Sequence, residues 1–273
     1  MNKQTLNAID AVKVLMRPFI PPSLLRARAE RNFFLERSWY AKHLGAFPSF
    51  ISANQYLSEK NIQGNGYVLD HESWLKERIK LSSHDYPPLF WISKLIAQNK
   101  LRSIIDFGGS VGVSYYAFKD YIEIPADLSW TVCELPEAAE MGAKIAKEKG
   151  ESQLSFVSDP TVISGASIFY AAGVLHYLDK TLAQLLVENN ANPGYLIINK
   201  LPLSSRESFV AIEGGGNGFY PCRIQCVSSF IREMRSIGYD VIDRWKCLEH
   251  RMDVILRPDL SFPHYQGFVL VKK

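Results

Sequence analysis

The 273-residue chain is poor in cysteine, in long apolar runs and in net charge. Four cysteines in a chain this long do not make a disulfide scaffold, and we expect reduced thiols. The longest charge-free stretch, between Asp159 and Asp179, contains serines and glycines, so it predicts a buried strand with its flanks and no membrane span. Asp10, Lys13 and Arg17 interrupt any apolar signal segment. We therefore expect a soluble cytoplasmic protein.

The positive charge is concentrated at the start of the chain. Residues 1–45 carry eight basic and three acidic side chains, a net charge of +5, whereas the whole chain carries +3. A total of +3 is too small to indicate nucleic-acid binding. Three interpretations of this basic arm stay open: a solvated helical cover, an amphipathic segment in peripheral contact with anionic lipid, or a docking face for an acidic acceptor.

The pattern changes near residue 100. Residues 1–100 predict helices, around 7–16, from Ser23, and around 74–81 and 89–98, with breaks at paired prolines and a loop at 45–50. Residues 101–273 alternate strands and helices. We expect two domains, an N-terminal helical extension (1–100) that covers the substrate and a cofactor-binding domain (101–273).

Seven strands with interleaved helices predict an α/β fold with a doubly wound sheet. The first five strands should be parallel, and the last should be antiparallel because residues 246–266 show no helical period. The expected strands are 103–107, 130–133, 154–157, 167–171, 195–198, 239–245 and 267–271.

The most informative segment follows the first of these strands, where Asp106 precedes a glycine-rich turn. Ligands of open α/β sheets bind beyond the carboxyl ends of the strands. Gly108, Gly109 and Gly112 occupy relative positions 1, 2 and 5, which fails the G-x-G-x-x-G pattern of dinucleotide sites. The Asp106 carboxylate would repel a pyrophosphate by about 3–4 kcal/mol and would attract an ammonium group.

Two more acidic residues follow the next strands. Glu134 ends the second strand, where a carboxylate can accept hydrogen bonds from both ribose hydroxyls. Asp159 follows the third strand and could accept from the exocyclic amine of adenine, although Asp-Pro is also a common turn. Amine, ribose and adenine occur together in S-adenosylmethionine, which we therefore expect as cofactor.

Residues 106–112, Glu134 and residues 171–179 resemble class I S-adenosylmethionine-dependent methyltransferases. This resemblance covers roughly residues 100–273, implies a Rossmann-like sheet, and adds Leu135 and Ala172 to the cofactor-binding residues. The whole chain also resembles a bacterial methyltransferase family that occurs with surface-polysaccharide genes. The segments that suggest it are residues 45–50, 86–88, 106–109, 130–136, 220–221 and 265–268.

His176 is the best candidate for a catalytic base because it follows the fourth strand on the substrate edge, and a neutral imidazole, whose unperturbed pKa is near 6.5, could take a hydroxyl proton. A structural imidazole that packs against the next helix is the alternative. His250 and His264, in the region between the last two expected strands, are weaker candidates for the base, and His250 is also expected as a substrate contact. Residues 213–220 look too flexible for a core element, so they predict either a mobile lid or a surface loop, with Tyr220 as an acceptor contact.

The sequence thus predicts a methyltransferase that methylates an oxygen of a small-molecule or glycan acceptor. An NAD(P)-dependent oxidoreductase and a non-catalytic scaffold remain as alternatives. No carboxylate or histidine cluster has the sequence spacing of a metal site, and the oligomeric state stays open.

Overall fold

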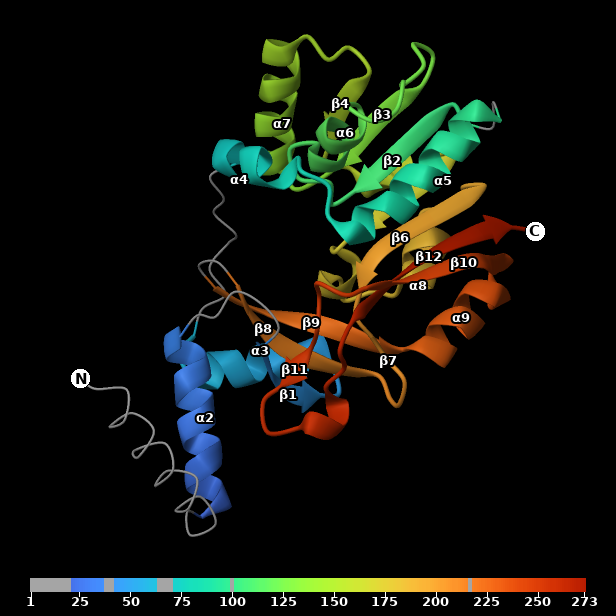
Figure 1. The fold of residues 1–273 in the computed structure, drawn as a ribbon. Coiled ribbons are helices and arrows are strands. Elements are labelled where there is room, and N and C mark those ends of the chain that lie inside the picture. Colours follow the sequence, from blue (N-terminus) through green and yellow to red (C-terminus); the bar gives the residue numbers. More distant parts are fainter. Residues whose placement is uncertain (1–20, 37–41, 63–70, 99–100, 216–217) are drawn as a thin grey trace, which may run out of the picture.

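The computed structural model describes residues 21–36, 42–62, 71–98, 101–215 and 218–273. Its centre is a seven-stranded sheet with the order β10-β12-β6-β5-β2-β3-β4 (Figure 1). The strands are β2 (Ser103–Phe107), β3 (Ser129–Cys133), β4 (Leu154–Val157), β5 (Ile168–Ala172), β6 (Tyr195–Leu201), β10 (Tyr239–Cys247) and β12 (Tyr265–Lys272). Strands β2 to β6 are parallel, and β12 is antiparallel to both its neighbours. The α/β fold class predicted from the sequence is confirmed.

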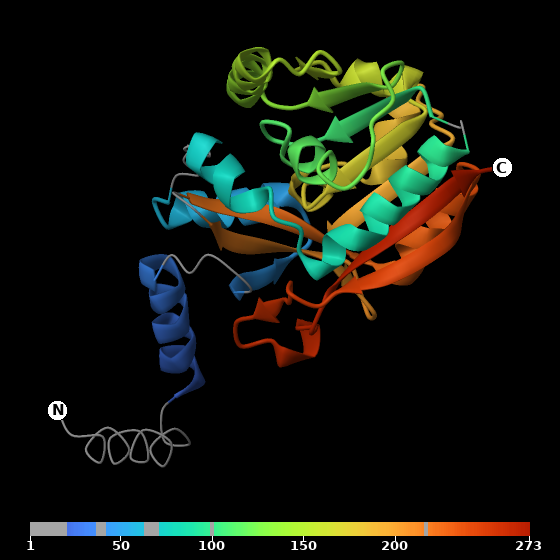
Figure 2. The same cartoon turned by 45° about the horizontal axis from the view of Figure 1, so that its top comes forward.

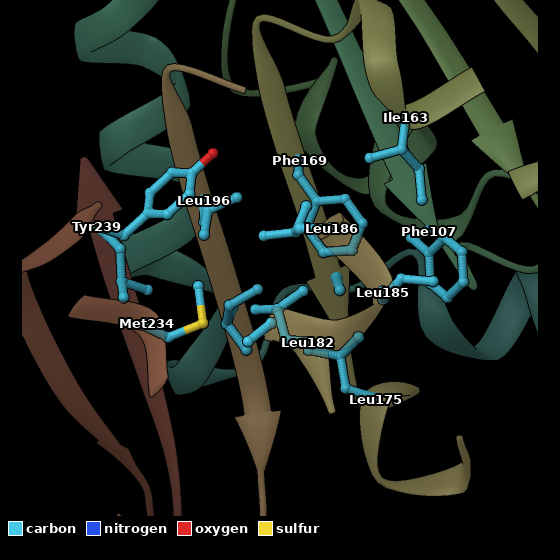
Figure 3. Close-up of a cluster of buried hydrophobic side chains, with 14 of the residues drawn as sticks. Phe107, Ile163, Phe169, Leu175, Leu182, Leu185, Leu186, Leu196, Met234 and Tyr239 are labelled. Carbon is cyan, nitrogen blue, oxygen red and sulfur yellow. The ribbon is translucent and has the colours of Figure 1, made fainter. Parts of the chain in front are cut away.

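Helices cover both faces of this sheet. On one face lie α5 (Tyr86–Ala97), α6 (Val113–Phe118) and α7 (Pro136–Lys149). On the other face lie α8 (Leu182–Glu188), α9 (Val227–Ser236) and the 3-10 helix η3 (Pro160–Gly165). Figure 3 shows the second core, where leucines of α8 meet Phe169 of β5 and Leu196 of β6. Because both faces are buried, the strands are apolar at successive positions.

Local sequence signals explain where the long helices begin and end. Pro136 stands at the first turn of α7, where its missing N–H costs no hydrogen bond, and Gly150 ends the helix with φ of +72°. Pro87 and Pro88 likewise stand in the first turn of α5. The helices expected around 74–81 and 89–98 are separate elements, α4 (His71–Arg78) and α5, and the proline pair stands in the first turn of the second, where proline is tolerated.

A second sheet of five strands has the order β11-β1-β8-β9-β7. The strands are β1 (Lys42–Phe47), β7 (Leu203–Ser204), β8 (Phe209–Gly215), β9 (Gly218–Cys226) and β11 (Asp253–Val254). Residues 45–50, expected as a loop, contribute to β1 and to the start of α3 (Phe50–Glu59), which Ser49 caps. Antiparallel pairing of β1 with β8, a partner far away in sequence, provides the hydrogen bonds that local propensity does not predict.

Of residues 213–220, expected as a mobile lid or a surface loop, 213–215 lie in β8 and 218–220 in β9, which pair antiparallel, while 216–217 lie outside the described residues. A side chain at Gly214 would meet the ring of Phe219 at 3.1 Å, so the small residue lets an aromatic ring pack against the backbone. Phe219 in turn contacts Phe33 and Phe34 of α2 (Pro22–Glu36). Phe219 thus belongs to a hydrophobic core that includes Phe33.

The second sheet lies beyond the carboxyl ends of β5 and β6 (Figure 1 and Figure 2). Its strands come from both sides of residue 100, since β1 pairs with β8 and β11. α5 packs on the main sheet, with Ile92 completely buried. Residues before position 100 thus supply a strand of the second sheet and a helix that covers the main sheet, while the division into two domains at residue 100 stays a prediction. The remaining elements are α4 (His71–Arg78) and the 3-10 helices η2 (Ser83–Asp85), η4 (Leu175–Tyr177) and η5 (Pro258–Leu260).

Other expectations concern the arm and the cysteines. α2 matches the helix expected from Ser23, whereas the helix expected at 7–16 lies outside the described residues. None of the described helices has both the length and the apolar character needed to cross a membrane. All four cysteines are buried and unpaired, as expected.

Candidate active site

The glycine-rich turn after β2 has an unusual backbone. Gly108 and Gly112 have φ of +70° and +88°, and Ser110 has φ of +54°. Glycine adopts left-handed φ values without steric strain, whereas serine does not, so the backbone of the turn is strained at Ser110. A Cβ atom at Gly109 would lie 2.5 Å from the carboxyl carbon of Asp106. The backbone of the turn therefore rests directly on that carboxyl group.

Asp106 is buried at the carboxyl end of β2, with 1% of its surface exposed. Trp130 Nε1 on the neighbouring strand donates a hydrogen bond of 3.3 Å to Asp106 Oδ2. Burial raises the pKa of the Asp106 carboxyl to about 7, although this hydrogen bond acts in the opposite direction. A group of this kind carries a charge that depends on small changes in its surroundings.

Glu134 follows β3 and is half-buried. Its Oε2 accepts a hydrogen bond of 2.6 Å from the backbone N–H of Leu135. Leu135 is 72% exposed and stands at the start of α7. Because β2 and β3 are paired in parallel, Asp106 and Glu134 lie at the same edge of the sheet, and the Glu134 charge contributes to the raised pKa of Asp106. The structure brings these two predicted carboxylates together.

Asp159 lies two strands away from β2 and has a local role. Its Oδ1 accepts a hydrogen bond of 2.9 Å from the backbone N–H of Thr161, which caps η3. The hydrogen bonds from Thr161 lower the pKa of Asp159, and the side chain is exposed. The turn that was the alternative interpretation is thus present, and contact with adenine stays a prediction. Ala172 ends β5, half-buried, at the same edge of the sheet.

His176 lies in η4, directly after β5, and is 4% exposed. Burial, followed by the electrostatic influence of the nearby His43, lowers the pKa of His176 to about 3. Its Nδ1 is buried and has no hydrogen-bond partner among the described residues. A buried polar atom without a partner is unusual and needs an explanation, such as a bound molecule.

His176 also lines a small hollow that opens to solvent. Lys180 and Arg223 line the same hollow, and Arg223 Nε is a second buried atom for which the described part of the chain offers no hydrogen-bond partner. The two unpartnered nitrogens therefore belong to residues around one space. Groups that donate hydrogen bonds to an acidic or hydroxyl-bearing molecule are thus available beside His176.

His250 and Tyr220 take different positions around this region. His250 is stacked on Tyr265 with ring centroids 5.7 Å apart, and Tyr265 also contacts His176. Burial, followed by the charge of His84, lowers the pKa of His250 to about 4. Tyr220 lies in β9, opposite Glu213 of β8, and is half-buried. Tyr265 thus connects the two predicted histidines.

Sequence reasoning missed a group of polar residues near the end of β6. Asn199 is 1% exposed and its Oδ1 accepts a hydrogen bond from Trp245 Nε1 at 3.1 Å. Lys200 follows with φ of +55°, and burial lowers its pKa. A charged residue with strained backbone at a strand end is a functional signal, but it appears only in three dimensions.

Sequence reasoning also missed His84 of η2. Its Nδ1 lies 3.1 Å from Glu249 Oε2, and its Nε2 lies 3.4 Å from Asp85 Oδ1. The ring also contacts His250 edge-on, with centroids 4.8 Å apart. Residues 84 and 249 are far apart in sequence and no motif connects them, so local patterns had no means of finding this pair.

Comparison with known proteins adds information on the fold alone. No protein-family model and no curated protein matches the sequence. One similar solved structure is the mitomycin 7-O-methyltransferase MmcR, with 17% identity and a TM-score of 0.43 over 63% of this chain and 49% of that one. The chain therefore spans about half the length of that protein.

Two further structures are similar over more of the chain. The 1,6-didemethyltoxoflavin-N1-methyltransferase of Burkholderia thailandensis, with 1,6-didemethyltoxoflavin and S-adenosylhomocysteine bound, has 15% identity and a TM-score of 0.47. It covers 78% of this chain and 95% of its own. The N-terminal domain of EvdMO1 with S-adenosylhomocysteine bound has 12% identity and a TM-score of 0.48 over 83% and 98%. Identities this low leave the reaction of this chain open.

Proposed function

We propose that the protein is an S-adenosylmethionine-dependent methyltransferase. One observation carries the proposal: Asp106, under a glycine-rich turn with left-handed backbone, and Glu134 lie at the carboxyl edge of adjacent strands. The chain passes from β2 to β3 and β4 on one side, and returns to β5 on the other side of β2. Open α/β sheets bind ligands at such a reversal of strand order.

The residues around the turn fit this cofactor. The buried Asp106 carboxylate can accept from the amino group of a cationic amino-acid tail, and Glu134 can accept from ribose hydroxyls. Ser110 Oγ is buried and without a hydrogen-bond partner among the described residues, so a donor is available in the turn. A dinucleotide fits less well, because its pyrophosphate would lie near two carboxylates. This argues against the oxidoreductase alternative.

When bound, S-adenosylmethionine supplies an electrophilic methyl group. The acceptor would lie in the hollow beside His176, where Arg223 and Lys180 can orient it. His176 Nδ1 would take the proton of the acceptor hydroxyl while the bond from oxygen to the methyl carbon forms and the bond from sulfur to that carbon breaks. Because the transfer removes a positive charge from the donor, protonation of His176 leaves the net charge of the cleft unchanged.

The finer assignments remain part of this proposal. Transfer to oxygen, and a small-molecule or glycan acceptor, are supported by an imidazole beside a hollow with hydrogen-bond donors. The remaining predicted contacts, Leu135, Ala172, Asp159, Tyr220 and His250, are proposed on the resemblance and on their places near the carboxyl edge of the sheet.

Cofactor binding gives the decisive test. Calorimetry should detect S-adenosylhomocysteine binding to the native chain but no binding of NAD, and Asp106→Asn should weaken the former at least tenfold. Asp127→Asn is the matched control, because Asp127 is exposed near the opposite edge of the sheet, where it pairs with Arg102. Binding of NAD alone, or of neither molecule, would overturn the proposal.

The scaffold alternative requires a second measurement. Methyl transfer from a radiolabelled donor into fractionated small-molecule and glycan extracts should label at least one acceptor fraction. Cofactor binding without any labelled product would favour a non-catalytic role.

A further inference from the structure

Three side chains from adjacent strands of the second sheet converge at one point. They are His43 of β1, Glu213 of β8 and Cys222 of β9, and their ligand atoms all lie within 4.8 Å of one another. His43 is directly opposite Glu213 across β1 and β8, and Cys222 lies two residues beyond the partner of Glu213 on β9. Side chains at these positions share one face of the sheet, so the backbone pairing itself holds them together.

The cluster is well shielded from water. His43 is 1% exposed and Cys222 is completely buried, while the Glu213 side chain is 13% exposed. His43 Nε2 lies 3.9 Å from Glu213 Oε2. The same carboxylate oxygen accepts a hydrogen bond of 2.7 Å from the Tyr177 hydroxyl of η4. Burying a carboxylate raises the free energy of the folded state unless nearby charges and hydrogen bonds compensate for the lost hydration.

We propose that His43, Glu213 and Cys222 bind a zinc ion. Imidazole nitrogen, thiolate sulfur and carboxylate oxygen are the three donor types that zinc takes in proteins. Zinc–ligand distances of about 2.0–2.3 Å and tetrahedral angles put neighbouring ligand atoms roughly 3.3–3.8 Å apart. The 3.9 Å between His43 and Glu213 is close to that range, and side-chain rotation can close the remaining gap to Cys222.

Charge and donor chemistry both favour this metal. One thiolate and one carboxylate neutralise a divalent ion, which suits a site with little access to water. Magnesium and calcium prefer sets of oxygen ligands, so a thiol and an imidazole select against them. Binding releases the Cys222 thiol proton to solvent as the zinc–sulfur bond forms. The Tyr177 hydroxyl would then orient the Glu213 ligand from outside the coordination sphere.

Three protein ligands leave one coordination position for water or for another molecule, a pattern typical of reactive zinc sites. The cluster lies next to the candidate active site, because Tyr177 follows His176 in η4 and their rings are 4.1 Å apart. Zinc binding itself does not depend on the proposed methyl transfer, so the two proposals can fail separately.

Cobalt substitution tests the site on the full chain. After removal of metals with a chelator, titration with Co²⁺ should saturate at one ion per chain. A thiolate-to-cobalt charge-transfer band should appear together with visible bands of tetrahedral cobalt, and Zn²⁺ should displace both. Absence of the charge-transfer band in the native protein would overturn the proposal.

Variants identify the ligands. Cys222→Ser should abolish the charge-transfer band, whereas Cys226→Ser, four residues further along the chain, should retain it. Tyr177→Phe removes one hydroxyl with little risk to folding and should weaken cobalt binding about 10–100-fold, as expected for loss of a partner outside the coordination sphere. His43→Gln and Glu213→Gln should each weaken binding at least tenfold. A charge-transfer band that survives in Cys222→Ser would contradict the assignment. Unchanged cobalt affinity in Tyr177→Phe, His43→Gln and Glu213→Gln would also contradict it.

Discussion

The indole N–H of Trp130 donates to the carboxylate of Asp106, with 3.3 Å between Nε1 and Oδ2, and both side chains are almost completely buried. This pair connects β2 with β3 below the glycine-rich turn. The hydrogen bond favours the charged carboxylate, whereas burial and the nearby Glu134 favour the neutral acid. Their balance leaves the pKa of Asp106 at about 7.

The raised pKa of Asp106 predicts a specific dependence of stability on pH. The folded protein holds this proton up to about pH 7, whereas an unfolded aspartate releases it near pH 3.9. Between these values the folded state binds more protons, so its stability falls as pH rises. The free energy of unfolding of the native chain should therefore fall relative to Asp106→Asn, on the order of 4 kcal/mol between pH 4 and pH 8.

Urea titration of both proteins at several pH values measures this difference. Taking the difference removes the contributions of His176 and His250, whose lowered pKa values act in the opposite direction in both proteins. Asp127→Asn should give a curve parallel to that of the native chain, and a pH-independent difference for Asp106→Asn would show that Asp106 is an ordinary carboxylate.

His176→Ala should reduce turnover by about 10²–10⁴-fold while the affinity for S-adenosylhomocysteine changes little. The reason is that the imidazole lies in η4, beside the hollow, and not in the glycine-rich turn. Single-turnover rates and calorimetry separate the two effects. His264→Gln, a half-buried histidine that does not line the hollow, serves as the control. Unchanged turnover in His176→Ala would remove the residue as the base.

Gly109→Ala should weaken cofactor binding and lower the melting temperature. A methyl group at this position would lie 2.5–2.7 Å from the carboxyl atoms of Asp106, so either the turn or the carboxylate must move. Gly165→Ala is a matched control, because its added Cβ meets nothing within 4 Å. Thermal unfolding with and without S-adenosylhomocysteine measures both effects. Equal behaviour of the two variants would contradict the close approach of the turn to Asp106.

Phe219→Ala should destabilise the protein by about 3–5 kcal/mol, as expected for loss of a buried aromatic side chain. Phe219 is 7% exposed and packs on Phe33 and Phe34, so the pair β8 and β9 is tied to α2. Tyr121→Ala, at a 58% exposed site, should have an effect within about 0.5 kcal/mol. A mobile lid would instead tolerate both changes equally, as judged by chemical denaturation.

The order of elements in the main sheet could be predicted because its signals are local. Gly150 ends α7 by adopting a left-handed backbone, and buried strands such as β2 are short apolar runs. Asp106 and Glu134 could be placed at one edge for a related reason: in a parallel sheet, every residue that directly follows a strand lies on the same side.

The second sheet could not be predicted, since β1 is stabilised by β8 more than 160 positions later in the chain. The same limit applies to the cluster of His43, Glu213 and Cys222, and to the contact of His84 with Glu249. Local sequence alone thus determined the succession of strands and helices after residue 100, the glycine-rich turn and two carboxylates at the sheet edge, because each depends on backbone preferences and burial within a few residues. Only the tertiary structure decided which distant polar side chains meet and how deeply they are buried, because both depend on pairing between strands that no local pattern encodes.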